Sequence, residues 1–157
     1  MTKPIDIPNS ITDFHGEHYW LDNMFLSPIV WQHGLEFNSV EQGFVYFKVE
    51  NRAFRPDILK ITDPYDVKAF GRSVPMRANW DEIKFGIMYE LVRKKFLQNE
   101  VLFRNLVLTG DKMLIEGNTW DDNIWGDCIC DQCRGIPGQN WLGKILMSLR
   151  AQFRDAR

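Results

Sequence analysis

The segment TWDDNIWGDCICDQCRG, residues 119–135, gathers side chains that can act on a substrate or bind a metal ion. Its first chemically useful pair is Asp122 and Trp125. A carboxylate can stabilise positive charge or orient water, and an indole ring can stack on a flat heterocycle. A turn-forming acid followed by a packed tryptophan produces the same pattern, so the sequence leaves both interpretations open.

The same segment holds all three cysteines of the chain, Cys128, Cys130 and Cys133. Their Cys-x-Cys-x-x-Cys spacing offers three thiols, whereas a closed structural zinc site uses four ligands. No second cysteine pair exists, and the three histidines are distant in sequence (His15, His18 and His33). We therefore expect free thiols, no metal and no cofactor, with a zinc site at the cysteines as the lesser alternative.

A second reactive group lies in SVEQGFVYFK, residues 39–48. Glu41 and Lys48 are separated by two turns of helix, so they share one helical face, which also carries Phe44. Burying a carboxylate and an amine on an aromatic-rich face is costly without a purpose. A lysine whose pKa is lowered can act as a nucleophile toward an aldehyde-like carbon. In the alternative interpretation, Glu41 only interacts with the dipole of its helix.

The elements that position these residues are expected to be mainly helical. Ser39 and Gln42 form a capping box for a helix over 40–54 that ends before Pro56, and Asp63-Pro64 begins the next helix. Further helices are expected over 79–96, 99–109 and 138–154, from capping residues and helical spacing of apolar residues.

Short strands or extended segments are expected over 19–25, 27–37 and 112–117, and two prolines make residues 1–12 an irregular lead-in. The predicted fold class is therefore predominantly α-helical α+β, with about five helices and a few short strands. A length of 157 residues fits one domain.

Composition limits the classes of function. The net charge of −2 and the pI of about 5.9 provide no basic footprint for duplex nucleic acid. Basic side chains for a local phosphate pocket are nevertheless present (Arg72, Arg77, Arg93, Lys94, Lys95, Arg150 and Arg154). No apolar run approaches the roughly 18 residues of a membrane span, and the first residues lack the apolar segment of a signal peptide. We expect a cytoplasmic protein.

Six fragments, in their order along the chain, resemble the NADAR family, also called the YbiA-like family. They are FHGEHYWLDNMFLSPI, FNSVEQGFVYFK, DPYDVKAFGRSV, NWDEIKFGIMYELVRKKFLQN, LVLTGDKMLIEGNTWDDNIWG and GQNWLGKILMSLR. They span residues 14–150, nearly the whole chain. A single fragment is unspecific, whereas the ordered set is specific. The resemblance implies one YbiA-like domain over residues 13–157.

The resemblance also implies an N-glycosidase. Some family members are similar to enzymes that cut the bond between ribose C1′ and an amino-pyrimidine nitrogen in riboflavin-pathway phosphates, and others remove ADP-ribose from guanine. The expected partner is a small ribosylated heterocycle or an ADP-ribosylated nucleic-acid base. In either reaction Glu41 and Asp122 would stabilise charge at C1′ and orient water, or Lys48 would capture C1′ as a Schiff base. The expected binding residues are Asn23, Arg72, Trp80, Trp125 and Asn140, with Glu116 supporting the loop of Asp122.

The chain departs from the family pattern near the Glu–Lys helix. Gln42 stands where His is usual, Val45 where Gln is common, Asp22 where Ser is usual and Asn79 where Asp is usual. These changes bear on substrate choice. The changes at 42 and 45 also motivate an alternative function, a non-catalytic module that senses ADP-ribose or NAD.

Overall fold

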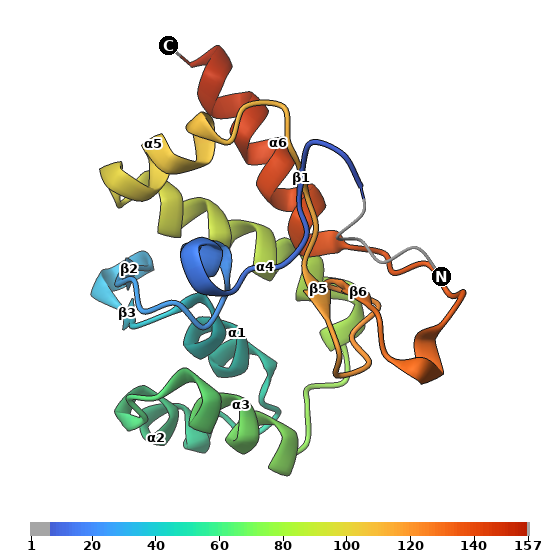
Figure 1. Cartoon of the computed structure of the whole chain (residues 1–157). Coiled ribbons are helices and arrows are strands. Elements are labelled where there is room, and N and C mark those ends of the chain that lie inside the picture. The colour runs from blue at the N-terminus through green and yellow to red at the C-terminus, as the bar shows by residue number, and fades with distance from the viewer. Residues whose placement is uncertain (1–6, 157) are drawn as a thin grey trace. The chain divides into compact units, whose positions relative to one another are not determined.

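The computed structural model describes residues 7–156, which divide into two compact units. The central unit comprises residues 23–100, and the terminal unit comprises residues 7–22 with 101–156. Six α-helices and three two-stranded sheets make up the regular structure of these residues (Figure 1). The predicted class, predominantly α-helical α+β, is confirmed.

The central unit is built on four α-helices, two 3-10 helices and one hairpin. The α-helices are α1 (Val40–Lys48), α2 (Arg55–Lys60), α3 (Pro64–Ser73) and α4 (Trp80–Leu97), and the antiparallel hairpin pairs β2 (Ile29–Val30) with β3 (Glu36–Phe37). The 3-10 helices are η3 (Gln32–Gly34) and η4 (Arg52–Phe54). Helix α1 packs against α2, α3 and α4. Its contact with α2 and α3 encloses an apolar cluster of Val45, Val49, Ile58 and Val67. Helix α1 is therefore the central element of this unit.

The start of α1 is partly as expected. Ser39 caps the helix, its Oγ accepting the backbone N–H of Gln42 at 3.1 Å. The side chain of Gln42 binds elsewhere: its Oε1 accepts the N–H of Asn38, and its Nε2 donates to the carbonyls of Ile58 and Ile61. Gln42 is 2% exposed, so these bonds fix α2 to α1 inside the unit.

The predicted end of the first helix is wrong. Helix α1 ends at Lys48, because the next residue, Val49, is extended and forms a bridge with Met76. The carbonyl of Lys48 accepts the N–H of Arg77 at 2.9 Å. Pro56 lies in the first turn of α2, where its missing N–H leaves no helical bond unmade.

The remaining central helices follow the predicted spacing. Asp63 caps α3 by accepting the N–H of Tyr65, as expected. The apolar stripe of α4 is buried at Met88, Leu91, Val92 and Phe96. Asn79 is the N-cap of α4, as expected, but its side chain makes no capping bond, because its Oδ1 accepts a bond from Nε of Arg77.

In the terminal unit, two short parallel sheets precede a long C-terminal helix. β1 (Ser10–Ile11) pairs with β4 (Met113–Leu114), and β5 (Gly117–Asn118) pairs with β6 (Asp127–Cys128). The other elements are α5 (Glu100–Leu108), α6 (Trp141–Asp155) and the 3-10 helices η2 (Gly16–Leu21) and η5 (Asp131–Cys133). The strand expected over 112–117 is present, whereas the segment from 19 begins in η2. Of the expected lead-in, residues 1–6 lie outside the described residues and residues 10–11 form β1.

Helix α6 packs on β4 and holds this unit together. Its Arg150, which is 7% exposed, donates to Oγ1 of Thr109 and to the carbonyl of Lys112. Arg154 forms an ion pair with Asp111 at 3.0 Å. Both arginines have partners within the chain, so they are poor candidates for a phosphate pocket. Among residues 7–156, each helix is too short or too polar to cross a lipid bilayer.

Gly43 permits the contact between α1 and α4. A Cβ at this position would lie 2.5 Å from Cδ2 of Leu91 and 2.9 Å from the ring of Phe37. We expect Gly43→Ala to lower the free energy of unfolding by about 1–3 kcal/mol, measured by urea denaturation. Gly86→Ala is the matched control, because nothing lies within 4 Å of its added Cβ. The control should raise stability by about 0.5–1 kcal/mol, and equal midpoints for the two variants would contradict this account.

Candidate functional site

The first group of predicted site residues lies in the terminal unit, around Asp122. The Oδ1 atom of Asp122 accepts the N–H groups of Ile124 at 3.0 Å and Trp125 at 2.9 Å. The amide of Asn118 binds both the N–H and the carbonyl of Asp122. The structure thus gives Asp122 the role of turn-forming acid, and the turn positions the half-buried Trp125.

Asn140 lies beside this loop, and backbone groups use both ends of its side-chain amide. Its Oδ1 accepts the N–H of Glu116 at 3.0 Å, and its Nδ2 donates to the carbonyl of Leu114 at 2.9 Å. The backbone of Asn140 is left-handed, with φ of 52°. Asn140 therefore joins the start of α6 to the strand segment, and its contact with a ribose stays a prediction.

Glu116 was expected to support the loop of Asp122, and its main chain lies against that loop. The carbonyl of Glu116 accepts the N–H of Asp127 at 2.9 Å. Glu116 as a whole is 9% exposed. Gly126 packs so closely here that an added Cβ would overlap the same carbonyl. The Asp122 loop is consequently held at both of its ends.

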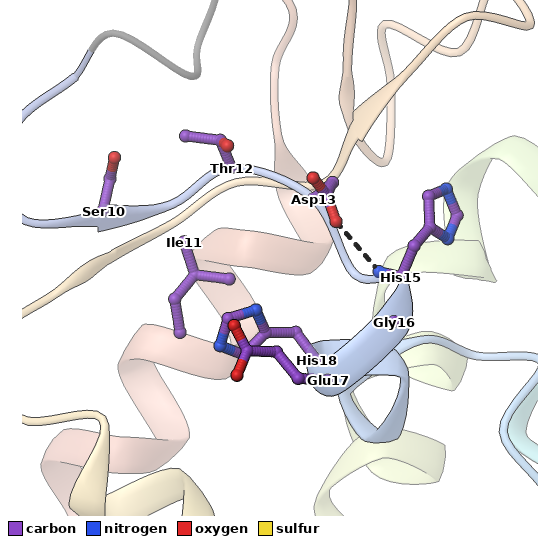
Figure 2. A pocket seen from close by; sticks show the side chains of 8 residues that line it. All are labelled: Ser10, Ile11, Thr12, Asp13, His15, Gly16, Glu17 and His18. Atoms are coloured by element: carbon purple, nitrogen blue, oxygen red, sulfur yellow. Dashed lines mark hydrogen bonds between the residues drawn. The ribbon is translucent and has the colours of Figure 1, made fainter.

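A surface hollow of about 510 Å³ lies in the terminal unit, at residues that the sequence did not indicate. It is lined by Ser10, Ile11, Thr12, Asp13, His15, Gly16, Glu17 and His18. Figure 2 shows the lining side chains, with Ile11 on β1 and Glu17 and His18 on η2. The ring of Trp120, a residue that is 42% exposed, lies 6.0 Å from the ring of His15, centroid to centroid. The lining of the hollow thus holds two acids, Asp13 and Glu17, and the imidazoles of His15 and His18.

The second group of predicted residues lies in the central unit, around Lys48. Burial lowers the pKa of Lys48, and the carboxylate of Glu41 opposes this by favouring the charged amine. The neighbouring cations Arg72 and Lys68 lower the pKa further. Helix α1 therefore presents Glu41 and Lys48 on one face as predicted, and α3 adds two positive charges.

Two other predicted residues of the central unit serve packing. Asn23 is buried, its carbonyl accepts the N–H of Glu41 at 3.1 Å and its amide contacts Sδ of Met88. It therefore orients the first turn of α1. Trp80 is only 4% exposed, and its ring meets Phe44 edge-on at 4.8 Å. Because so little of its surface is exposed, the Trp80 ring is poorly placed to stack on a base. Trp80 packs at the start of α4 instead.

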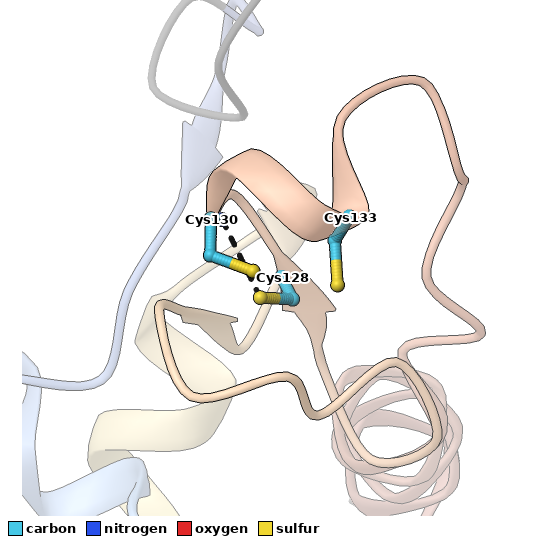
Figure 3. Close-up of side chains that lie close together, drawn as sticks. All are labelled: Cys128, Cys130 and Cys133. Atoms are coloured by element: carbon cyan, nitrogen blue, oxygen red, sulfur yellow. Dashed lines mark hydrogen bonds between the residues drawn. The ribbon is translucent and has the colours of Figure 1, made fainter.

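The three cysteines converge in the terminal unit, as Figure 3 shows. Their Sγ atoms lie within 4.8 Å of one another. A hydrogen bond with the thiol of Cys128 lowers the pKa of Cys130. The carboxylate of Asp121, which accepts a bond from the Cys133 thiol, raises the pKa of Cys133. The spacing of the cysteines alone did not indicate this carboxylate.

The chain is similar to a known protein family and to several known proteins. The NADAR domain model matches residues 12–154. Protein irg-1 of Caenorhabditis elegans is 33% identical over 132 residues, 76% of this chain and 62% of that protein. N-glycosidase Npun_R5314 of Nostoc punctiforme is 37% identical over 108 residues, 68% of this chain and 65% of that protein. The chain therefore spans less than two thirds of the length of these two relatives.

The Escherichia coli protein YbiA is similar in both sequence and structure. N-glycosidase YbiA is 32% identical over 122 residues, 76% of this chain and 72% of that protein. The NMR structure of YbiA superposes with a TM-score of 0.79 at 28% identity, covering 96% of this chain and 88% of that one.

The turn at Asp122 can be separated from its charge. Asp122→Asn keeps an Oδ1 acceptor for the N–H groups of Ile124 and Trp125, so we expect stability close to that of the parent protein. Asp122→Ala removes the acceptor and should lower the free energy of unfolding by about 1–2 kcal/mol in thermal or urea denaturation. Equal loss in both variants would show that the charge, rather than the turn, stabilises the loop.

Proposed function

Because the chain belongs to the NADAR family, we propose that it is an N-glycosidase that cleaves the bond between ribose C1′ and an exocyclic amine of a base. Two similar proteins, Npun_R5314 and YbiA, carry the name N-glycosidase. The observation that carries the proposal for this chain is the charge cluster of the central unit, where Glu41 and Lys48 share one face of α1 beside Arg72. Each of these groups meets one need of the reaction.

Glu41 supplies the negative charge that the reaction needs. When the base departs, positive charge develops on C1′ and on the ring oxygen, and a nearby carboxylate stabilises it and orients the attacking water. Glu41 lies in the first turn of α1, and its N–H bond to the carbonyl of Asn23 fixes that turn. Water then adds its oxygen to C1′, and its proton leaves with the amine of the base.

Lys48 offers a covalent route to the same products. A ring-opened ribosylamine is an imine, and a neutral amine can attack its C1′, expel the base as an amine and form a Schiff base that water hydrolyses. Burial and the neighbouring cations lower the pKa of Lys48, which increases the neutral fraction of its amine. The proposed nucleophile is therefore the Nζ atom of Lys48.

Arg72 and Lys68 make the phosphate of a ribosylated substrate a suitable ligand. Both lie on α3, and both act electrostatically on Lys48. Arg72 is exposed, so its guanidinium is open to a phosphate oxygen. The proposed substrates are accordingly a ribosylamino-pyrimidine phosphate of the riboflavin type or an ADP-ribosylated guanine, which share the C1′–N bond and a phosphate.

The alternative of an ADP-ribose or NAD sensor was motivated by positions 42 and 45. In the structure, Gln42 binds backbone groups around α2, and Val45 is buried against Gly71. These two departures from the family pattern are therefore explained by packing. A sensor that binds ADP-ribose without cleaving any glycoside is one outcome that the following assay distinguishes.

The proposal predicts a large loss of turnover in Glu41→Gln. We expect kcat to fall by about 10²- to 10⁴-fold, because the carboxylate charge is lost while the side-chain shape is kept. The assay compares release of ribose phosphate from a ribosylamino-pyrimidine phosphate with release of ADP-ribose from ADP-ribosylated guanine DNA. Glu82→Gln is the matched control, since Glu82 is an exposed acid in the first turn of α4.

The covalent route has a separate readout. Borohydride reduction during turnover should attach the sugar to Lys48, seen as a mass increase on the peptide containing it. A Lys48→Arg variant with full activity would exclude the Schiff base and leave the Glu41 route. Full activity in Glu41→Gln, or no cleavage of either substrate despite ADP-ribose binding, would overturn the proposed function.

Lys48 should also be costly for stability at neutral pH. Its pKa in the folded state is lowered from 10.5, so below that lowered pKa the folded protein carries a half-buried charge that is disfavoured. We expect Lys48→Met to be more stable than the parent at neutral pH. The difference should shrink as pH rises toward 10.5, because the folded amine loses its proton first. Lys60→Met, at an exposed lysine on α2, is the control for alkaline unfolding measured by circular dichroism.

A further inference from the structure

The three cysteines form a cluster that the proposed reaction does not use. Cys128 ends β6, Cys130 precedes η5 and Cys133 ends it, and the single turn of η5 brings the last two together through a bond from the Cys133 N–H to the Cys130 carbonyl (Figure 3). All three Sγ atoms lie within 4.8 Å of one another. Three thiols gathered in this way form most of a metal site.

Asp121 places a carboxylate beside one of the three thiols. Its Oδ1 lies 3.0 Å from Sγ of Cys133, and its N–H points to Sγ of Cys128 at 3.2 Å. The N–H of Cys130 also donates to Sγ of Cys128, at 3.4 Å. Backbone N–H groups directed at a sulfur favour its thiolate form. Asp121 has a left-handed backbone, φ of 66°, which turns its carboxylate and its N–H toward the thiols together.

We propose that Cys128, Cys130 and Cys133 bind one Zn²⁺ ion, and that the carboxylate of Asp121, which contacts Sγ of Cys133, turns in to become the fourth ligand. Zinc takes sulfur ligands at about 2.3 Å in a tetrahedron, which places the sulfurs about 3.8 Å apart. The Sγ atoms, which lie within 4.8 Å of one another, would therefore approach one another by about 1 Å or less. The half-buried Cys130 lies nearest to solvent and is free to make that adjustment by side-chain rotation.

The chemistry of the donor set favours this class of metal. Thiolates select zinc over magnesium and calcium, and a carboxylate oxygen completes the four-coordinate shell without an open position for catalysis. Binding transfers the thiol protons to solvent, and the bonds formed are three Zn–S bonds and one Zn–O bond. The site is thus structural and needs no oxidant or reductant.

The consequence for the molecule is local. Asp121 precedes Asp122, whose carboxylate forms the turn that positions Trp125. Zinc at Asp121 would join that turn to β6 and η5. The inference goes beyond the proposed function, because the metal holds a loop and takes no part in cleavage at C1′.

Metal content and a cobalt spectrum test the site without any activity assay. Protein purified under reducing conditions, without added zinc or chelator, should contain close to one zinc per chain by mass spectrometry. Apoprotein titrated with Co²⁺ should develop intense thiolate-to-cobalt absorption and tetrahedral d–d bands. Cys133→Ser should lose the metal, and Asp121→Asn should bind zinc at least about tenfold more weakly.

Asp131→Asn is the matched control, because Asp131 is an exposed acid of the same loop that pairs with Arg134. It should retain zinc and the cobalt spectrum. Metal-free protein with three titratable thiols and no cobalt charge-transfer band would overturn the proposal. A disulfide between two of the cysteines, detected after purification in reductant, would overturn it as well. Unaltered metal affinity in Asp121→Asn would remove Asp121 from the ligand set.

Discussion

The close approach of α1 to its neighbours is the constraint on which the central unit depends. At Gly43 a side chain would overlap Leu91 of α4, and at Gly71 a Cβ would lie 2.9 Å from Val45 of α1. Two glycines therefore let α1 pack directly between α3 and α4. The residue after Gly71 is Arg72, so the contact that seats α3 also brings a positive charge to Lys48. The close contact at Gly71 therefore determines both the packing of α3 on α1 and the position of Arg72 near Lys48.

Local signals predicted the starts of helices and missed the ends that depend on distant residues. Ser39 and Asp63 cap their helices as the sequence indicates, because the bond partner is two or three residues away. The end of α1 at Lys48 was not predictable in this way. It depends on Val49 pairing with Met76, far along the chain, which gives the backbone an extended alternative to helix.

The same distinction applies to the candidate site. The shared face of Glu41 and Lys48 follows from the helical period and was predicted. The tasks of Asn140 and Trp80 were not, because they arise from tertiary contacts with Leu114 and Phe44. An asparagine whose amide is satisfied by backbone groups differs in no sequence property from one that binds a sugar. A residue type alone therefore sets what a side chain can do, and its surroundings select between the options.

In the cysteine loop, the sequence spacing reveals three possible metal ligands, and the structure adds Asp121 as the proposed fourth. Three cysteines within six residues are conspicuous, whereas an acid ahead of them is one of many on the chain. Asp121 is distinguished only by its left-handed backbone, which directs both its N–H and its carboxylate to sulfur atoms. The adjoining Asp122 turns toward Trp125 instead. Two consecutive acids thus serve different parts of one loop, because Asp121 contacts the thiols and Asp122 accepts the backbone N–H of Trp125.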